Sequence, residues 1–185
     1  LIVTPIDYND IVVGDKNAIM IAARVLGYGK DYTFTLEDEE HTVDLTEVDD
    51  KELKEEHLLS KGQNEFEFTL PTIKKSVTFK ILTHGDEKKI DNEVKGIKKA
   101  KKGESPESST RLKHMILSVD GDTERKTIRE FVDTQLLARD ARALRAYLKE
   151  IQPDIDLLFN LETEEGEKEV RIPIGITFFW PDSEL

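Results

Sequence analysis

The feature that most constrains this chain is a pattern that occurs twice. Residues 131–165 align with residues 6–40 without a gap when 125 is subtracted from each number, and eight of the 35 pairs are identical. Ordinary composition would give about two identities between unrelated segments of this length. Both segments read as a helix followed by a hairpin, so we interpret them as a duplicated helix–hairpin module. The alternative is a coincidence between two amphipathic units.

The second copy shows the pattern most clearly. Apolar residues recur at helical spacing on one face of its helix: Leu137, Leu144, Leu148 and Ile151. Asp140 can cap the first free amides, and Pro153 ends the helix because it lacks a backbone donor and restricts the residue before it. Residues 155–161 and 168–174 are rich in apolar side chains, which predicts two strands joined by an acidic tip.

The first copy follows the same order. Gly14 and Asp15 open a helix, and Gly27 and Gly29 end it because glycine accepts the left-handed geometry of a helix end. We expect its buried stripe to consist of Ala18, Ile19, Ala22, Ala23 and Leu26. Apolar residues then alternate over 32–36 and return at 43–45, after an acidic tip. A second hairpin is therefore predicted here.

The chain between the two copies reads as a series of short elements. We predict a polar helix over 46–60, a hairpin of 66–70 with 77–81, a helix opening at 85–86, a mobile Lys-rich loop over 98–110, a helix begun by Thr110 with Leu112, Met115, Ile116 and Val119 inward, and a helix over 127–132. The predicted fold class is α+β, with two related helix–hairpin modules flanking a central hairpin and helices. The corresponding segments are 1–60, 61–110 and 111–185.

Composition excludes several classes of function. A net charge of −12 argues against nucleic acid as the main ligand, since phosphates would be repelled. The absence of cysteine excludes disulfides, thiolate catalysis and cysteine metal sites. No apolar run approaches the roughly 20 residues that a membrane helix needs. The chain begins at Leu1 instead of methionine, so we expect it to be part of a longer protein. A nucleic-acid binder acting through Lys98–Lys102 stays an alternative.

No set of reactive side chains stands out. The histidines His41, His57, His84 and His114 are scattered and lack metal-ligand spacing. The glycines of 27–30 end a predicted helix instead of opening one, which does not suit a phosphate loop. Acidic groups at 37–40, 120–122 and 162–165 are typical of solvated tips and a tight turn. We therefore predict no catalytic residue, no cofactor and no metal. A small cytosolic enzyme or regulator with a scattered site remains the alternative.

An aromatic tail is the most informative feature for binding. Phe178, Phe179 and Trp180 directly precede Pro181 and an acidic end. On a strand, the first and third rings would face one side and the second ring the other. One face can enter the core, and the other can anchor a partner, because aromatic residues are frequent interface anchors. These three residues are our protein-interface candidates, with ordinary core packing as the alternative.

Several segments together resemble a known family. They are FEFTLP (66–71), VTFKILTHGDE (77–87), STRLKHMILSVDG (109–121) and RIPIGITFFWP (171–181). In this order they resemble the base-plate proteins of contractile-tailed, T-even-like phages, the family that includes base-plate hub assembly proteins, over about 11–181. The resemblance implies a structural or assembly component of the virion tail base plate, present in the host cytoplasm during assembly. Its partners would be other base-plate or hub proteins, without nucleic acid, membrane or small-molecule substrate. It would either stay in the virion or leave as an assembly chaperone.

One departure from that family concerns the hairpin tips. The resemblance implies a Cys-x-x-Cys pair at each tip, as in a zinc ribbon, near Leu36 and Glu39 and near Leu161 and Glu164. This chain has no cysteine, so its hairpins cannot hold zinc in that way. A hairpin without its metal must be held by its own packing. The candidates are Phe34, Leu36, Phe159 and Leu161.

Overall fold

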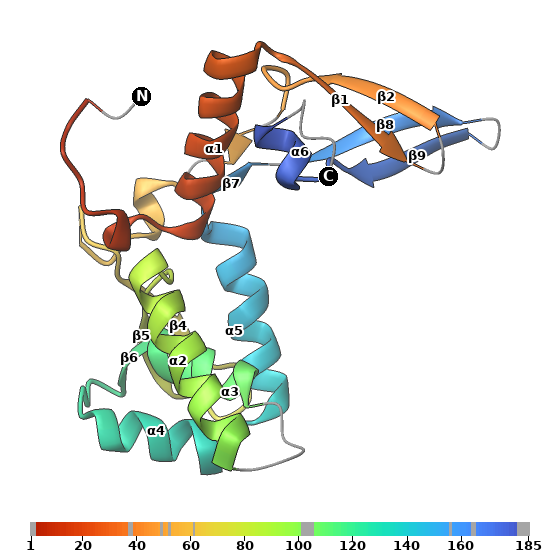
Figure 1. Cartoon of the computed structure of the whole chain (residues 1–185). Coiled ribbons are helices and arrows are strands. Elements are labelled where there is room, and N and C mark those ends of the chain that lie inside the picture. The colour runs from red at the N-terminus through yellow and green to blue at the C-terminus, as the bar shows by residue number, and fades with distance from the viewer. Residues whose placement is uncertain are drawn as a thin grey trace. The chain divides into compact units, whose positions relative to one another are not determined.

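A computed structural model of the chain describes residues 3–36, 39–48, 50–51, 53–60, 62–100, 106–155, 157–163 and 166–180 (Figure 1). It mixes helices with small antiparallel sheets, which agrees with the predicted α+β class. The chain divides into two compact units. The hairpin unit is drawn mainly from Gly14–Glu52 and Pro153–Leu185, and the sheet unit from Pro5–Val13 and Leu53–Gln152. Each unit is thus built from separate stretches of the chain.

The sheet unit surrounds one antiparallel sheet with the order β4-β5-β6. Its elements are the 3-10 helices η1 (Tyr8–Asp10) and η2 (Glu55–His57), the strands β4 (Phe66–Thr69), β5 (Ser76–Phe79) and β6 (Ile116–Val119), and the helices α2 (His84–Ala100), α3 (Glu107–Met115), α4 (Arg125–Thr134) and α5 (Ala138–Ile151). Phe66 lies opposite Phe79 in the register of β4 and β5. Their fully buried rings join apolar side chains of all four helices in one core. The predicted central hairpin and the helices at 85–86 and 127–132 are confirmed.

The start of α2 shows how a short sequence signal fixes an element. Thr83 and Asp86 hydrogen-bond reciprocally: the backbone N–H of Thr83 donates to Oδ2 of Asp86 over 3.2 Å, and the backbone N–H of Asp86 donates to Oγ1 of Thr83 over 3.3 Å. This arrangement is a capping box, which satisfies two amides that a helix start leaves free. Nζ of Lys80 lies 2.6 Å from Oδ2 of Asp86 and compensates its buried charge.

Three predictions for the middle of the chain are wrong in whole or in part. The polar helix over 46–60 is absent from its described residues, which hold β3 (Asp50–Lys51) and η2. Residues 116–119 form β6, because β5 offers a free edge on which Val119 pairs with Val77. The predicted loop over 98–110 is shorter, since Lys98 and Lys99 continue α2 and Thr110 lies inside α3 without capping it. Residues 101–105 lie outside the described part.

Helix α5 carries the predicted core face, but its acidic residue has another role. Leu144 and Ile151 are buried, whereas Leu137 is exposed at the N-cap position. Asp140 is fully buried, and its Oδ1 accepts the backbone N–H of Thr72 over 2.7 Å instead of capping its own helix. The helix ends at Ile151, as the following proline predicts.

The hairpin unit contains two hairpins of equal length. Its elements are α1 (Val13–Tyr28), β1 (Asp31–Leu36), β2 (Glu39–Asp44), β3, β7 (Asp154–Ile155), β8 (Leu158–Thr163), β9 (Gly166–Arg171) and the single turn α6 (Ile176–Phe179). Strands β1 and β2 pair over six residues, and so do β8 and β9. The start of α5 lies 125 residues after the start of α1, whereas β8 begins 127 residues after β1. The ungapped alignment therefore fits the two helix starts and is displaced by two residues at the hairpins.

Helix α1 is seated in the hairpin unit by its first glycine. A Cβ atom added to Gly14 would lie 1.8 Å from the carbonyl oxygen of Pro153, so any larger residue would force the backbones apart. The predicted buried stripe is wrong: Ile21 and Arg24 are buried, and Leu26 is 73% exposed. Apolar residues lie on nearly every side of this helix, so their spacing alone does not single out the buried face.

Candidate functional site

Aromatic rings hold the two hairpins together. The Phe34 ring on β1 meets the Phe159 ring on β8 edge to face, with centroids 5.5 Å apart, and the hairpins lie side by side (Figure 1). Tyr32 packs edge-on against Phe178 at 4.9 Å, and its hydroxyl donates to the carbonyl oxygen of Pro173 over 2.9 Å. Edge-to-face pairs are worth about 0.5–1.5 kcal/mol beyond the area they bury. The packing predicted for Phe34, Leu36 and Phe159 is confirmed; the side chain of Leu161 lies outside the described part.

A buried arginine stands at the centre of these rings. Arg24 of α1 is only 5% exposed, and its guanidinium carbon lies 5.0 Å from the Tyr28 ring centroid, 5.7 Å from that of Tyr32 and 6.0 Å from that of Phe178. Its terminal nitrogens donate to the carbonyl oxygens of Gly29, over 3.2 Å, and Asp31, over 3.4 Å. The guanidinium thus joins the end of α1 to the start of β1. Sequence reasoning missed it because the buried stripe predicted for α1 held only apolar residues; the Arg24–Tyr28 spacing of four was the available signal.

The aromatic tail does not form the predicted strand. Residues 176–179 make one helical turn, α6, which turns the three rings in different directions. Phe178 is fully buried against Tyr32 and belongs to the core of the hairpin unit, while Phe179 is half-buried. Trp180 is 61% exposed, and its ring lies 6.2 Å from that of Phe179. Phe178 therefore anchors the segment, and Trp180 offers a large ring to solvent.

Each of the four histidines contacts a different neighbour. His114 contacts Glu93 over 2.8 Å, His84 packs on Tyr8, His57 on Tyr147 and His41 on Phe34. Glu39 and Glu40 are exposed at the first tip, and the tip residues 37–38 and 164–165 lie outside the described part. No group of three or more His, Cys, Asp or Glu among the described residues is placed to hold a metal. Leu36 and Glu39 also do not form a donor set for zinc.

The base of the first hairpin carries a large shift in acidity. Hydrogen bonds from Nζ of Lys30 and from the hydroxyl and backbone N–H of Thr46 hold the pKa of Asp44 at about 2, below its ordinary value of 3.8. The same contact with Asp44 raises the pKa of Lys30. These bonds close the hairpin at the end opposite to its tip. They serve structure, because all three groups are already satisfied by one another.

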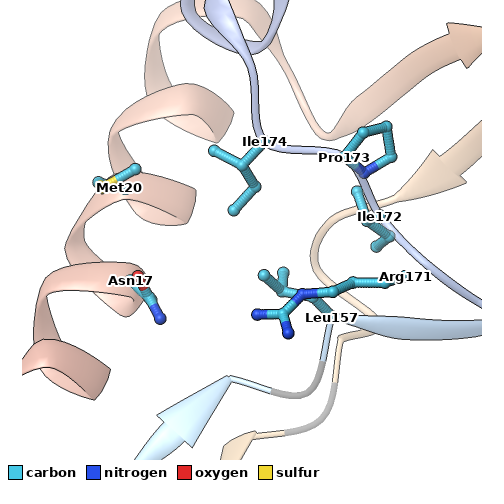
Figure 2. A pocket seen from close by; sticks show the side chains of 7 residues that line it. All are labelled: Asn17, Met20, Leu157, Arg171, Ile172, Pro173 and Ile174. Atoms are coloured by element: carbon cyan, nitrogen blue, oxygen red, sulfur yellow. The ribbon is translucent and has the colours of Figure 1, made fainter. Parts of the chain in front are cut away.

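A pocket lies between α1 and the base of the second hairpin (Figure 2). It encloses about 370 Å³ and is lined by Asn17, Met20, Leu157, Arg171, Ile172, Pro173 and Ile174. Figure 2 shows the Arg171 guanidinium reaching into the space between Asn17 and Leu157. Asn17 donates its side-chain N–H to Oδ1 of Asp154 over 3.1 Å. Sequence reasoning did not find this pocket, because its walls are 137 or more residues apart in the chain.

Comparison with known proteins found no matching family model, no matching curated protein and no matching solved structure. None of the helices in the described ranges is both long and apolar enough to cross a membrane.

Proposed function

We propose that this chain is a structural or assembly component of a contractile phage tail base plate, and that it acts through contacts with other base-plate or hub proteins. The support is the resemblance of its segments to that family together with one geometric observation. Phe178 fixes the tail in the core, while Trp180, two residues later, is 61% exposed. A large ring that is held at its root and exposed at its end suits an interface anchor, which loses little conformational entropy on binding.

The proposal includes a duplicated helix–hairpin module without metal. In its support, both hairpins have six paired residues per strand and both follow a helix at nearly the same spacing. The Phe34–Phe159 contact supplies, between the hairpins, the cohesion that a metal would supply within each. On this proposal the hairpins are a scaffold whose stability needs no metal ion. Chelators such as EDTA should accordingly leave the melting temperature unchanged.

Substitution of Trp180 tests the proposed interface. The full chain and its Trp180→Ala variant are co-expressed with the base-plate proteins of the same phage, and the captured complexes are quantified. We expect at least about a tenfold loss of complex, because truncating an anchor residue costs 2 kcal/mol or more. The melting temperature should stay within a few degrees, since the ring is largely exposed. Leu59→Ala, which removes another exposed apolar side chain, is the matched control.

The result separates three readings of the tail. Loss of complex with normal melting supports the interface, whereas loss of both would assign Trp180 to folding. Normal capture by the variant, or no capture by the native chain, contradicts the proposal. Mass spectrometry of purified virions then distinguishes the two roles that the family allows. Peptides of this chain in the virion indicate a permanent component, and their absence indicates a chaperone that leaves.

A further inference from the structure

The pocket of the hairpin unit combines apolar walls with one cationic group. Met20 from α1 and Ile174 from the segment after β9 form half-buried walls, and Leu157 lies buried behind them (Figure 2). Arg171 ends β9, where its backbone pairs with Leu158, so the strand register fixes the root of its side chain. A space of about 370 Å³ holds roughly a dozen water molecules at about 30 Å³ each, or two to three residues of a peptide.

The Arg171 guanidinium has capacity for a ligand. Among the described residues, none forms a hydrogen bond or an ion pair with this side chain. A guanidinium presents its donors as a planar fork that matches the two oxygens of a carboxylate. The Arg171 side chain is exposed, so its charge lies on the solvent side of the pocket, beside the apolar walls. The group that suits this position is therefore a carboxylate carried by an apolar body.

Asn17 gives the opposite rim a complementary polar group. Its side-chain N–H is taken up by Asp154, and that contact leaves the side-chain oxygen of Asn17 as an acceptor. The Asp154 oxygen also accepts the backbone N–H of Ile155 over 2.9 Å, so this carboxylate is already occupied. An acceptor opposite a cationic fork suits a peptide, which offers backbone N–H groups as well as an acidic side chain. A simple fatty acid has no donor for Asn17.

We propose that this pocket binds a short segment of a partner protein in which an acidic side chain adjoins a bulky apolar one. The carboxylate pairs with Arg171, the apolar side chain packs between Met20 and Ile174, and a backbone N–H of the segment donates to Asn17. The net charge of −12 does not prevent this, because charges beyond about 8 Å are largely screened at physiological salt. This inference rests on the proposed function, since it supplies the chemistry of a protein partner.

A peptide titration tests the pocket without any base-plate protein. The ¹⁵N-labelled full chain is titrated, by NMR, with a blocked tetrapeptide that carries leucine next to aspartate. We expect saturable shifts at the amides of Asn17, Met20 and Ile174, with a Kd on the order of 1 mM for so small a contact. The same peptide with asparagine in place of aspartate, or alanine in place of leucine, should bind several-fold more weakly.

Two variants and one matched control locate the binding. Arg171→Gln should weaken the peptide about tenfold or more, because a hydrogen bond to a charged group is lost. Met20→Trp should abolish binding by filling the pocket from the opposite wall, which keeps the test valid if the first variant fails to fold. Arg142→Gln removes the same charge from an exposed position of the sheet unit and should leave the Kd unchanged.

The outcomes are distinct. Binding that needs the aspartate, the leucine and Arg171 supports the proposal, even if Trp180 proves irrelevant to base-plate assembly. Absence of saturable shifts at 5 mM peptide overturns it, as does equal binding to Arg171→Gln and the native chain. Octanoate, a carboxylate without peptide groups, is titrated in parallel. If octanoate saturates the pocket and the peptide does not, the site takes small carboxylates and the assignment to a protein segment is wrong.

Discussion

The two units of this chain are stabilised in different ways. The sheet unit has a broad core in which aliphatic and aromatic side chains of β4, β5, β6 and four helices interlock. The hairpin unit has a smaller core, whose buried members among the described residues are Ile21, Tyr32, Phe34, Leu45, Leu157, Ile172 and Phe178. Aromatic rings and one buried cation supply much of its contact. The comparison shows that the packing between the two hairpins involves few but large side chains.

The buried polar groups of the two units also differ in what they contact. In the sheet unit, the fully buried Asp140 fastens a turn by accepting the backbone N–H of Thr72. In the hairpin unit, Arg24 bridges two carbonyl oxygens and contacts three aromatic rings. Its removal would open the junction between α1 and β1. The hairpin unit therefore has a buried cation among its aromatic rings, whereas the buried carboxylates of the sheet unit, Asp86 and Asp140, accept backbone N–H groups at a helix start and in a turn.

Truncation of one buried ring in each core should reveal the difference between the two units most strongly. Phe178→Ala and Phe79→Ala each remove a fully buried ring, and each should cost about 3–5 kcal/mol locally. The smaller core has less remaining contact, so Phe178→Ala should abolish amide protection throughout β1, β2, β8 and β9. Phe79→Ala should leave a destabilised sheet unit that still protects its amides. Hydrogen exchange followed segment by segment measures both. Equal loss of protection in the two units would contradict the comparison.

Substitutions of Arg24 should have the next largest effect. Arg24→Ala leaves a cavity among three rings and two carbonyl oxygens without donors, which we expect to cost about 3 kcal/mol in unfolding free energy. Arg24→Met keeps most of the apolar volume and loses only the donors, so it should cost about half as much. Denaturant unfolding monitored by Trp180 fluorescence reports on the hairpin unit.

The pair of Arg24 variants separates packing from hydrogen bonding. If both variants cost the same, the two carbonyl contacts carry the stabilisation, and the rings contribute little. Arg142→Met, at an exposed position of α5, is the control for loss of one positive charge. A melting temperature of Arg24→Ala within about one degree of the native value would show that the buried cation is dispensable. The packing of the hairpin unit would then not depend on Arg24.

Sequence patterns predicted most elements whose signals are local. Alternation over 66–70 and 77–81 predicted β4 and β5, and Pro153 placed the end of α5 correctly. The elements that failed depend on distant contacts. Ile116 to Val119 fit either a helix or a strand, and the free edge of β5 decided between them. The tail was predicted as a strand, but it forms a helical turn in which Phe178 packs against Tyr32. The pocket between α1 and the base of the second hairpin could not be predicted, because its walls are distant in the sequence and meet only in the fold.

The candidate site was predicted only in its residue types. Phe178, Phe179 and Trp180 were singled out as a group, and the structure gives them three different exposures. Arg24 was missed because a charged residue is assigned to solvent unless a partner is known, and its partners are two carbonyl oxygens and three rings. Nothing in the spacing of Arg171 and Asn17 along the chain indicates that they face one pocket.

The smallest expected effect is on acid stability, which also differs between the units. Lys30 and Thr46 hold the pKa of Asp44 at about 2, and a carboxylate with a lowered folded pKa stabilises the fold above its unfolded pKa of about 3.8. That contribution should be lost as pH falls from about 4 to about 2. In the sheet unit, burial raises the pKa of Asp86, but hydrogen bonds from Lys80 and Thr83 outweigh burial and lower it.

Carboxyl NMR titration of Asp44 and hydrogen exchange at several pH values test this in one set of samples. Asp44→Asn should remove the pH dependence between 4 and 2 from amides of β1 and β2, while that of α2 persists. Lys30→Met should move the Asp44 midpoint upward, although the Thr46 hydrogen bonds keep it below 3.8. An Asp44 midpoint near 3.8 in the native chain would mean that the contacts with both Lys30 and Thr46 do not persist in solution. The base of the first hairpin would then be held by its backbone pairing, including the hydrogen bond from the N–H of Leu45 to the carbonyl oxygen of Lys30, and by the packing of Tyr32.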